Sequence, residues 1–330
     1  MIKISVIVPC RNEIRYIDGC VESILNQDFP HDEMEVLFVD GMSTDGTRNK
    51  LIDICSKYSF CKFLDNPQFV VPTALNIGIK NAQGDVIMRL DAHTFYKPQY
   101  ISTLYHQLFK LNADNVGCVC KTDVIAKTPK SLAIKCTMSS LFGVGNSNFR
   151  TGVDDVQLVD TVPFGCYRRE VFNRYGLFDE RLARNQDIEF NKRIVNGGGQ
   201  IYLIPETLCT YYSRDNFREL ADINYANGFW NIMTVRITRR LSALSLRHFI
   251  PMLFVLSLLL PSLLMLANVW FGTIALMVLV VYFTTMMFFA LRIVKTNRDI
   301  KIKHLACSFI IMHVMYGYGS LIGLFALKYK

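Results

Sequence analysis

The sequence predicts an α/β fold with a mostly parallel sheet, followed by a C-terminal helical region in a membrane. In the first two-thirds of the chain, short apolar runs alternate with helical patterns, which is typical of βαβ units whose sheet is covered on both faces. From Phe249 onward, charge almost disappears apart from one basic stretch near residues 292 to 303. We therefore expect a first domain over residues 1–247 and a transmembrane region of about three helices over residues 248–330.

The expected elements of the first domain alternate regularly. Strands are expected over Ile4–Val8, Val36–Val39, Lys62–Leu64 and Val86–Leu90, and helices over Ile14–Asn26, Thr47–Lys57 and Thr73–Asn81. In open sheets of this kind, ligands bind outside the carboxyl ends of the strands. Polar residues directly after each strand are therefore candidate site residues.

Three of these strands are followed by acidic residues. The candidates are Pro9, Arg11, Asn12 and Glu13 after the first strand, Asp40 after the second, and Asp91, Ala92 and His93 after the fourth. Taken alone, Asp40 could be a turn residue and Glu13 could be an acid favoured at a helix start. Three carboxylates at one edge of a sheet favour a binding site over three separate structural roles.

The apolar third contains three candidate membrane spans. They run over Phe249–Ala267, Thr273–Leu291 and His304–Leu327. Each is close to the ~20 residues that cross the hydrocarbon core of a bilayer. The alternative is a buried helical hairpin of a soluble protein, and the summed length and the lack of charge argue against it.

Basic residues predict the orientation. Four precede the first span and five lie between the second and third: Arg236, Arg239, Arg240, Arg247, Arg292, Lys295, Arg298, Lys301 and Lys303. The connection near residues 268–272 carries no charge, so the positive-inside rule places the first domain and the basic loop in the cytoplasm. Lys328 and Lys330 disagree with this arrangement, because three spans would put them outside.

The net charge and the cysteines indicate which binding partners and which covalent or metal sites to expect. The net charge of +8 gathers beside the spans, which favours anionic membrane lipids over nucleic acid. The ten cysteines are scattered, and Cys118 and Cys120 are too close for a CxxC pair. We therefore expect reduced thiols, with neither disulfides nor a zinc site.

Three segments carry a family resemblance. They are Val-Ile-Val-Pro-Cys-Arg-Asn-Glu, Val-Asp-Gly-Met-Ser-Thr-Asp-Gly-Thr and Ala-Leu-Asn-Ile-Gly-Ile-Lys-Asn-Ala-Gln-Gly-Asp-Val-Ile-Met-Arg-Leu-Asp-Ala-His. In this order and spacing the chain resembles the family 2 glycosyltransferases with a GT-A (Rossmann-like) fold, from residue 3 to about residue 215. It is most similar to bacterial exopolysaccharide glycosyltransferases of the succinoglycan type, which join such a catalytic domain to C-terminal membrane spans.

The resemblance implies roles for the strand-end residues. Pro9, Arg11 and Glu13 would border the nucleotide pocket, and Asp40 would hydrogen-bond the base, usually uracil. Asp91 and His93 stand at the DxD motif of the family, which holds a divalent cation on the donor diphosphate. Mg²⁺ or Mn²⁺ suits these ligands, and the histidine shifts the preference toward Mn²⁺. His93 either binds the metal or only hydrogen-bonds a phosphate, and both readings stay open.

The acceptor side is implied by later segments. Residues 164–172 and 176–180 resemble the acceptor-side segment of the family, and Asp187 matches its general base, which takes the proton of the attacking hydroxyl. Gln186 replaces the usual Glu before this base. Glu189 is a competing candidate, but two residues on in a helix it points elsewhere.

Two arginines and the absence of a motif indicate how the substrate is bound and how many sugars are transferred. Arg214 and Arg218 precede the membrane region, where they could hold a donor or lipid diphosphate, or bind headgroups. Processive synthases carry Gln-x-x-Arg-Trp here, whereas residues 227–230 keep only the Trp. A single transfer per acceptor is therefore expected.

Together these observations predict an inverting glycosyltransferase in the cytoplasmic (inner) membrane, with its catalytic domain in the cytoplasm. It would move one sugar from a nucleotide-sugar, with UDP as the expected nucleotide, to a hydroxyl of a polyprenyl-diphosphate-linked saccharide. The cell would use the product in surface polysaccharide synthesis. The alternatives are a polyprenyl-phosphate sugar synthase, whose acceptor needs no base, and a non-catalytic membrane-bound sensor of sugar nucleotides.

Overall fold

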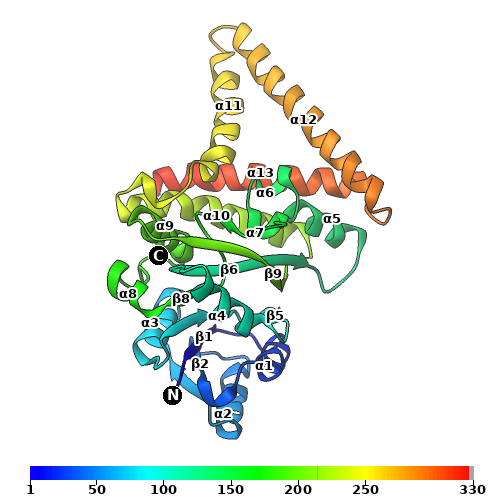
Figure 1. Cartoon of the computed structure of the whole chain (residues 1–330). Helices are drawn as coiled ribbons and strands as arrows, with labels where there is room; N and C mark the ends of the chain where they lie inside the picture. Colours follow the sequence, from blue (N-terminus) through cyan, green and yellow to red (C-terminus); the bar gives the residue numbers. More distant parts are fainter. Residues whose placement is uncertain (214, 327–330) are drawn as a thin grey trace. The chain divides into compact units, whose positions relative to one another are not determined.

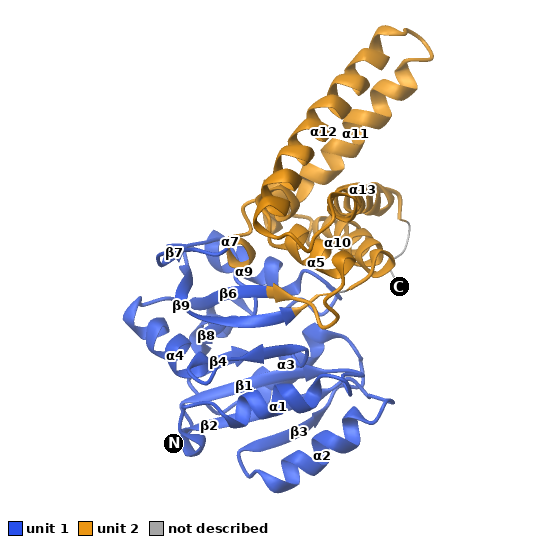
Figure 2. Ribbon diagram, turned by 90° about the vertical axis from the view of Figure 1, so that its right-hand side faces the viewer, with its two compact units in different colours: residues 1–121, 152–211 blue, residues 122–151, 212–330 orange. Residues whose placement is uncertain are grey.

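The computed structural model describes residues 1–213 and 215–326, which divide into two compact units (Figures 1 and 2). The first, here called the α/β unit, contains residues 1–121 and 152–211. The second, the helical unit, contains residues 122–151 and continues from residue 212 to the end of the chain. The expected division of the chain after residue 247 into a catalytic and a membrane part stays a prediction.

The α/β unit is built on one sheet, nine-stranded over the described residues, in the order β3-β2-β1-β4-β8-β6-β9-β5 with β7 paired to β9. The strands are β1 Ile4–Cys10, β2 Met34–Asp40, β3 Cys61–Asp65, β4 Val86–Arg89, β5 Thr94–Tyr96, β6 Asn115–Asp123, β7 Gln157–Leu158, β8 Cys166–Arg168 and β9 Ile201–Tyr212. The first four are the strands expected from the sequence, and β1 pairs in parallel with both β2 and β4. Beyond β4 the sheet continues antiparallel through β8. The predicted α/β fold is confirmed.

Helices of this unit are α1 Ile17–Leu25, α2 Thr47–Lys57, α3 Val71–Asn81, α4 Tyr100–Lys110, α8 Arg169–Tyr175 and α9 Gln186–Asn196. Helix α3 lies directly on β1, since a Cβ at Gly78 would come within 2.5 Å of the Ile7 side chain. Helix α1 begins three residues later than expected. The reason is local: the amide of Ile14 donates to Asp45, and residues 13–16 form a turn.

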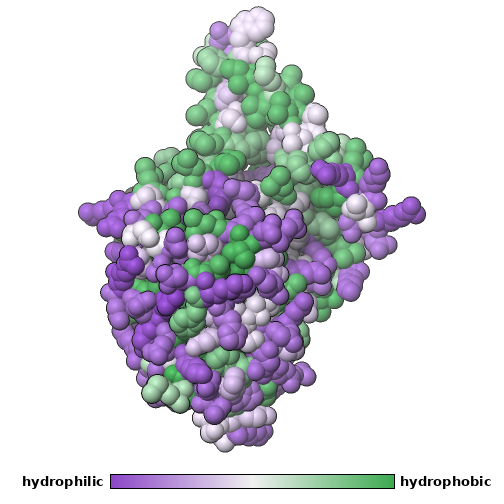
Figure 3. Space-filling model, viewed as in Figure 1, coloured by the Kyte–Doolittle hydropathy of each residue, from purple (hydrophilic) through white to green (hydrophobic). Residues whose placement is uncertain are grey.

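The helical unit consists of α5 Pro129–Met138, α6 Leu141–Val144, α7 Asn148–Thr151, α10 Phe217–Thr238, α11 Ile250–Leu264, α12 Trp270–Thr296 and α13 Ile302–Phe325. Three stretches of it are long and apolar enough to cross a membrane: residues 246–264, 270–296 and 302–325. These correspond to the three expected apolar segments, although Leu327 and the dissenting Lys328 and Lys330 lie outside the described residues. Figure 3 shows hydrophobic residues gathered over the α11 and α12 hairpin.

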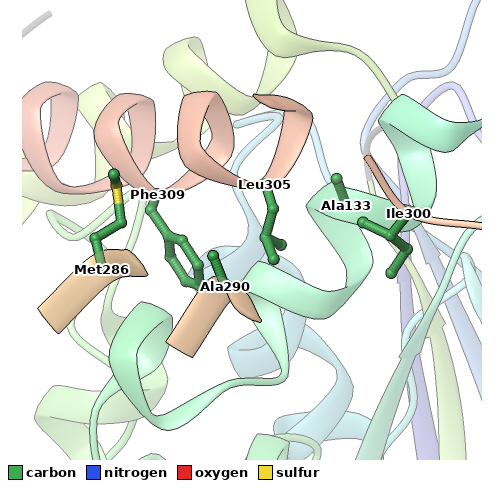
Figure 4. Packing of buried hydrophobic residues seen from close by; sticks show 6 residues of the cluster. All are labelled: Ala133, Met286, Ala290, Ile300, Leu305 and Phe309. Carbon is green, nitrogen blue, oxygen red and sulfur yellow. The ribbon is translucent and has the colours of Figure 1, made fainter. Parts of the chain in front are cut away.

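A buried cluster joins segments of the helical unit that are far apart in the sequence (Figure 4). Ala133 from α5, Met286 and Ala290 from α12, and Leu305 and Phe309 from α13 meet there together with Ile300. The segment 122–151 is thus part of the same core as the C-terminal helices.

Candidate active site

One pocket lies at the carboxyl ends of β1, β2 and β4. Five of the residues singled out by the sequence line it: Pro9, Arg11, Glu13, Asp91 and His93. Gly41, Asn66, Phe69 and Arg89 line it as well. The structure therefore brings together most of the candidates, and it leaves Asp40 and Asp187 outside the set of lining residues.

The segment after β1 is held by the segment after β2. Asn12 adopts a left-handed backbone conformation, with φ of 55°, and its amide donates to Ser43 Oγ at 2.9 Å. The next amide, of Glu13, donates to Thr47 Oγ1 at 2.9 Å. In return Asn12 Oδ1 accepts the amide of Thr44 at 2.9 Å. These reciprocal bonds keep Arg11 and Glu13 at the rim of the pocket.

Asp40 is fully buried beneath this loop pair. Its carboxylate accepts the hydroxyl of Ser43 at 2.5 Å, the amide of the same residue at 3.0 Å and the guanidinium of Arg48 at 3.2 Å. Arg48 also pairs with Asp65 at 2.6 Å. In this conformation Asp40 organises the loop, and its expected contact with the base stays a prediction.

Arg11 forms one wall of the pocket. Its guanidinium lies 4.8 Å from the ring centroid of Phe69, and it donates to the carbonyl oxygen of the same residue at 3.4 Å. Phe69 is 47% exposed and has a φ of 66°, a conformation that is uncommon outside glycine. The strained loop therefore presents an aromatic face and a fixed cation together.

Arg89 at the end of β4 forms a bidentate ion pair with Asp91. Nε lies 2.8 Å and Nη2 3.0 Å from the two carboxylate oxygens, and both side chains are almost buried. Burial alone would lower the pKa of Arg89, but Asp91 raises it more and Asp187 adds to the same effect, so the pKa lies above the ordinary value for arginine. The remaining nitrogen, Nη1, is buried and has no hydrogen-bond partner among the described residues.

The backbone of Asp91 is also fixed. Its amide donates to the hydroxyl of Tyr96 at 2.7 Å, and that tyrosine is buried in the core. Beside it, His93 Nδ1 lies 3.3 Å from Glu13 Oε1. Glu13 from one strand end thus faces the same pocket as Asp91 and His93 from another.

These residues fit a divalent cation that arrives with a diphosphate. No group of three or more His, Cys, Asp and Glu side chains that could hold a metal by itself is present among residues 1–213 and 215–326. Mg²⁺-type sites, however, commonly use only one or two protein ligands together with substrate phosphates. Asp91 and His93 offer ligand atoms of the kinds that such a partial set uses, and their role as metal ligands stays a prediction. The pair of Arg89 with Asp91 means that a cation would meet a carboxylate already neutralised by a guanidinium.

Asp187 stands in the first turn of α9, after Asn185, which has a φ of 62°. Its Oδ1 accepts the amide of Ile188 at 2.9 Å. The negative charge of Asp187 contributes to the raised pKa of Arg89, and after burial it is the next cause of the raised pKa of Tyr167. Asp187 therefore lies within electrostatic reach of the pair formed by Arg89 and Asp91.

The competing carboxylate, Glu189, is engaged elsewhere. It is buried and forms a close ion pair with Arg193, at 2.6 Å and 3.0 Å. Arg193 also donates to the carbonyl oxygens of Tyr175 and Leu177. This geometry gives Glu189 a structural role in the turn before α9.

The comparisons with known proteins decide the family. The sequence model of Glycosyl transferase family 2 matches residues 5–176. The chain belongs to this family. It is a glycosyltransferase, and its expected similarity to succinoglycan-type proteins is confirmed by the relatives.

Two curated relatives are informative. A Methanococcus voltae protein named dolichyl N-acetyl-alpha-D-glucosaminyl phosphate 3-beta-D-2,3-diacetamido-2,3-dideoxy-beta-D-glucuronosyltransferase is 28% identical over 246 residues, covering 70% of this chain and 76% of its own. Succinoglycan biosynthesis protein ExoA of Rhizobium meliloti (strain 1021) is 29% identical over 211 residues, covering 63% of each chain.

A solved structure supports the fold. The mannosyltransferase PcManGT from Pyrobaculum calidifontis, in complex with GDP-Man and Mn²⁺, superposes with a TM-score of 0.63 at 18% identity. The match covers 99% of this glycosyltransferase and 88% of the other chain. At this identity the likeness concerns the GT-A fold, which is the fold expected from the sequence.

Some site residues were not singled out by the sequence. Arg89 interrupts an apolar strand, and a charged residue within a buried run was the signal that could have identified it as a site residue. Phe69 and Asn66 come from a loop without a distinctive pattern. Arg218 is exposed in the first turn of α10, Arg214 lies outside the described residues, and their role with a diphosphate stays a prediction.

Proposed function

We propose that this glycosyltransferase moves one sugar, with inversion, from a UDP-sugar to a hydroxyl of a lipid-linked saccharide used in cell-surface polysaccharide synthesis. The named substrate of the Methanococcus voltae relative is a sugar on a dolichyl phosphate, and the Rhizobium meliloti relative is named for an exopolysaccharide. The first name supports an acceptor that is a saccharide built on a lipid carrier, and the second supports a role in polysaccharide synthesis. A polyprenyl-diphosphate carrier agrees with the apolar helices of the chain.

One observation carries the mechanism. Arg89 holds both oxygens of Asp91 at the pocket, and the charge of Asp187 contributes, after Asp91, to the raised pKa of Arg89. In an inverting transfer, the base must stand near the sugar carbon that is attacked, and this carbon adjoins the donor diphosphate. A carboxylate close to the proposed diphosphate site is therefore what the reaction needs.

The roles of the residues follow from this arrangement. Asp187 takes the proton of the acceptor hydroxyl as it attacks the sugar carbon, while the bond to the diphosphate breaks. Arg89 lines the pocket and neutralises Asp91 beside the proposed diphosphate site. A divalent cation, Mn²⁺ or Mg²⁺, supplies charge neutralisation for the departing group when it is bound, and Asp91 and His93 are the residues that would hold it. Pro9, Arg11, Glu13 and Asp40 are assigned to the nucleotide side.

The cellular setting is part of the proposal. We assign the catalytic domain and the basic loop to the cytoplasmic side of the inner membrane, on the asymmetry of the basic residues. Membrane lipids, the nucleotide-sugar and the lipid-linked acceptor are then the partners. A membrane anchor brings a water-soluble donor and an insoluble acceptor to one enzyme.

Asp187→Asn tests the mechanism. The substitution keeps the size and the hydrogen bonding but cannot accept a proton, so transfer should fall at least ~100-fold, a barrier increase of ~2.7 kcal/mol. Affinity for the donor nucleotide should stay the same, and the product should have the inverted anomeric configuration. Donor choice is read from nucleotide release with a panel of UDP-, GDP- and TDP-sugars.

Glu189→Gln is the matched control. It removes a neighbouring carboxylate that pairs with Arg193, so it should lower stability while leaving the transfer rate per folded enzyme nearly unchanged. A loss of less than about tenfold in Asp187→Asn would favour a polyprenyl-phosphate synthase, whose acceptor is already ionised. A product with retained configuration would contradict the single displacement.

A further inference from the structure

We propose that only α11 and α12 cross the membrane, and that α13 lies along the membrane surface with its exposed apolar face against lipid. The chain before α11 and the chain after α12 would then be on the same side. This inference goes beyond the proposed function and does not depend on it. It concerns only the helical unit.

The three apolar helices differ in how far the protein covers them. In the most apolar stretch of α13, 39% of the residues are buried, against 6% in the stretch that contains α11 and 11% in α12. Figures 1 and 2 both show α13 running crosswise to the α11 and α12 hairpin. One bilayer cannot be crossed both by the hairpin and by a helix that runs crosswise to it.

The C-terminal half of α13 is packed against α10. A Cβ at Gly228 of α10 would overlap the carbonyl oxygen of Tyr316, and one at Gly319 would overlap that of Tyr225. Ser320 Oγ also donates to the carbonyl oxygen of Gly228 at 3.1 Å. The two helix backbones are in direct contact, so this half of α13 can enter hydrocarbon only together with α10.

Helix α10 cannot be in hydrocarbon. It carries four charged residues, Arg218, Glu219, Asp222 and Arg236. Among the described residues it is not one of the helices apolar enough to span a membrane. A charged side chain at the centre of a bilayer costs at least ~2.5 kcal/mol. Placing α13 across the bilayer would take this polar partner with it.

The N-terminal half and the middle of α13 are covered by segment 122–151. Leu305 and Phe309 belong to one buried cluster with Ala133 of α5 (Figure 4). Helix α5 also carries Lys135, which pairs with Asp123 at 2.8 Å. At the midpoint, His313 Nε2 lies 2.9 Å from the carbonyl oxygen of Phe142.

Phe142 lies in α6, a single helical turn that irregular backbone follows. The residues that follow α6 form no regular element, and Gly145 and Asn146 are exposed. Irregular backbone that touches lipid is excluded from hydrocarbon, because its polar groups would go unpaired. The midpoint of α13 is therefore outside the bilayer core.

The uncovered face of α13 fits a lipid surface. Cys307, Val314, Tyr318 and Phe325 are exposed, and at 100° per residue they lie within about 40° of one another on the helix. Exposed basic residues stand before α11, before α13 and in the first turn of α13: Arg239, Arg240, Arg298, Lys301 and Lys303. An apolar stripe with basic neighbours is typical of helices in the interface of anionic membranes.

This arrangement also explains the charges that three spans leave unexplained. With two spans, Lys328 and Lys330 fall on the same side as the basic loop between α12 and α13. All the basic clusters near the membrane then obey the positive-inside rule.

Tryptophan depth measurements test the position of α13. The full chain, with Trp230→Phe and Trp270→Phe, is placed in phosphatidylethanolamine and phosphatidylglycerol vesicles that carry bromine either near the headgroup or near the acyl chain ends. Val314→Trp, at the midpoint of α13, should be quenched by the shallow bromines several-fold more than by the deep ones. Val280→Trp in α12, also exposed, is the matched control and should show the reverse.

Equal depth profiles for the two variants would overturn the proposal, and so would a Val314→Trp variant that neither lipid quenches. A second measurement does not depend on these substitutions. A reporter that is active only in the cytoplasm, fused after the last residue, should give the same signal as one fused in the basic loop. A reporter in the turn between α11 and α12 should give none. Loss of the C-terminal signal would establish a third span and refute the inference.

Discussion

Replacing Arg89 by Met should destabilise the α/β unit and make its stability depend on Mn²⁺. Arg89 neutralises Asp91 through two hydrogen bonds, and the side chains are only 11% and 13% exposed. Removing one partner of a buried ion pair costs about 3–5 kcal/mol, because the other charge stays buried without compensation. Methionine fills the volume of the aliphatic stem, so most of the loss reports the charge.

Mn²⁺ should restore much of this loss. In the wild type a cation must share Asp91 with the guanidinium, whereas in Arg89→Met it meets an uncompensated carboxylate. A ligand that binds only the folded state stabilises it by RT ln(1 + [L]/Kd), so tighter binding appears as a larger gain in stability. We therefore expect a clear stabilisation of the variant by Mn²⁺ and a small one of the wild type.

Hydrogen exchange of the amides in β1 and β4 is the appropriate assay, since both tryptophans belong to the helical unit and would not report on this sheet. Lys62→Met is the matched control. It removes the cation from the buried carboxylate of Glu35, outside the pocket, and should lower stability without any response to Mn²⁺. A loss under ~1 kcal/mol in Arg89→Met, or equal responses of the two variants to Mn²⁺, would refute the reasoning.

Chelator should abolish transfer and Mn²⁺ should restore it best. Asp91→Ala should be folded and inactive, whereas His93→Asp should keep activity and shift the metal preference toward Mg²⁺. If His93→Asp is inactive with every metal, His93 has another role. Gly78→Val should destabilise the α/β unit by about 1–3 kcal/mol in hydrogen exchange, because its Cβ would meet Ile7, while Gly19→Ala, with open space around it, should not. Burial raises the pKa of Glu35, but hydrogen bonds from Lys62, Ser5 and Gln83 lower it more. The stability that ionised Glu35 contributes should be complete above about pH 4.5, the ordinary pKa of a glutamate, and should be lost as the pH falls through the pKa of the folded state. Glu35→Gln should therefore make the stability of the α/β unit less dependent on pH in acid.

The parallel part of the sheet was predictable because its signal is local. Apolar runs and the polar residues after them identify strand ends, and parallel strands bring their carboxyl ends to one edge. Pro9, Arg11, Glu13, Asp91 and His93 line one pocket for this reason. The residue that pairs with each carboxylate could not be predicted in this way. Nothing in the spacing of Asp40 and Arg48, or of Arg89 and Asp91, tells whether a side chain faces the ligand or a neighbour.

Helix α13 shows where hydropathy stops being informative. Its stretch from residue 316 to residue 323 alternates apolar and small residues, with Gly317, Gly319, Ser320 and Gly323 all buried. Small residues of this kind let helices approach closely, and they do so in membranes and in water alike. Composition therefore cannot distinguish a span from a covered helix. The partner can: α10 touches Gly319, Ser320 and Gly323 and is too polar for lipid, whereas Gly317 meets the N-terminal part of α11. The small-residue face therefore marks contact with protein. The environment of an apolar helix is decided by the polarity of the helix that it packs against.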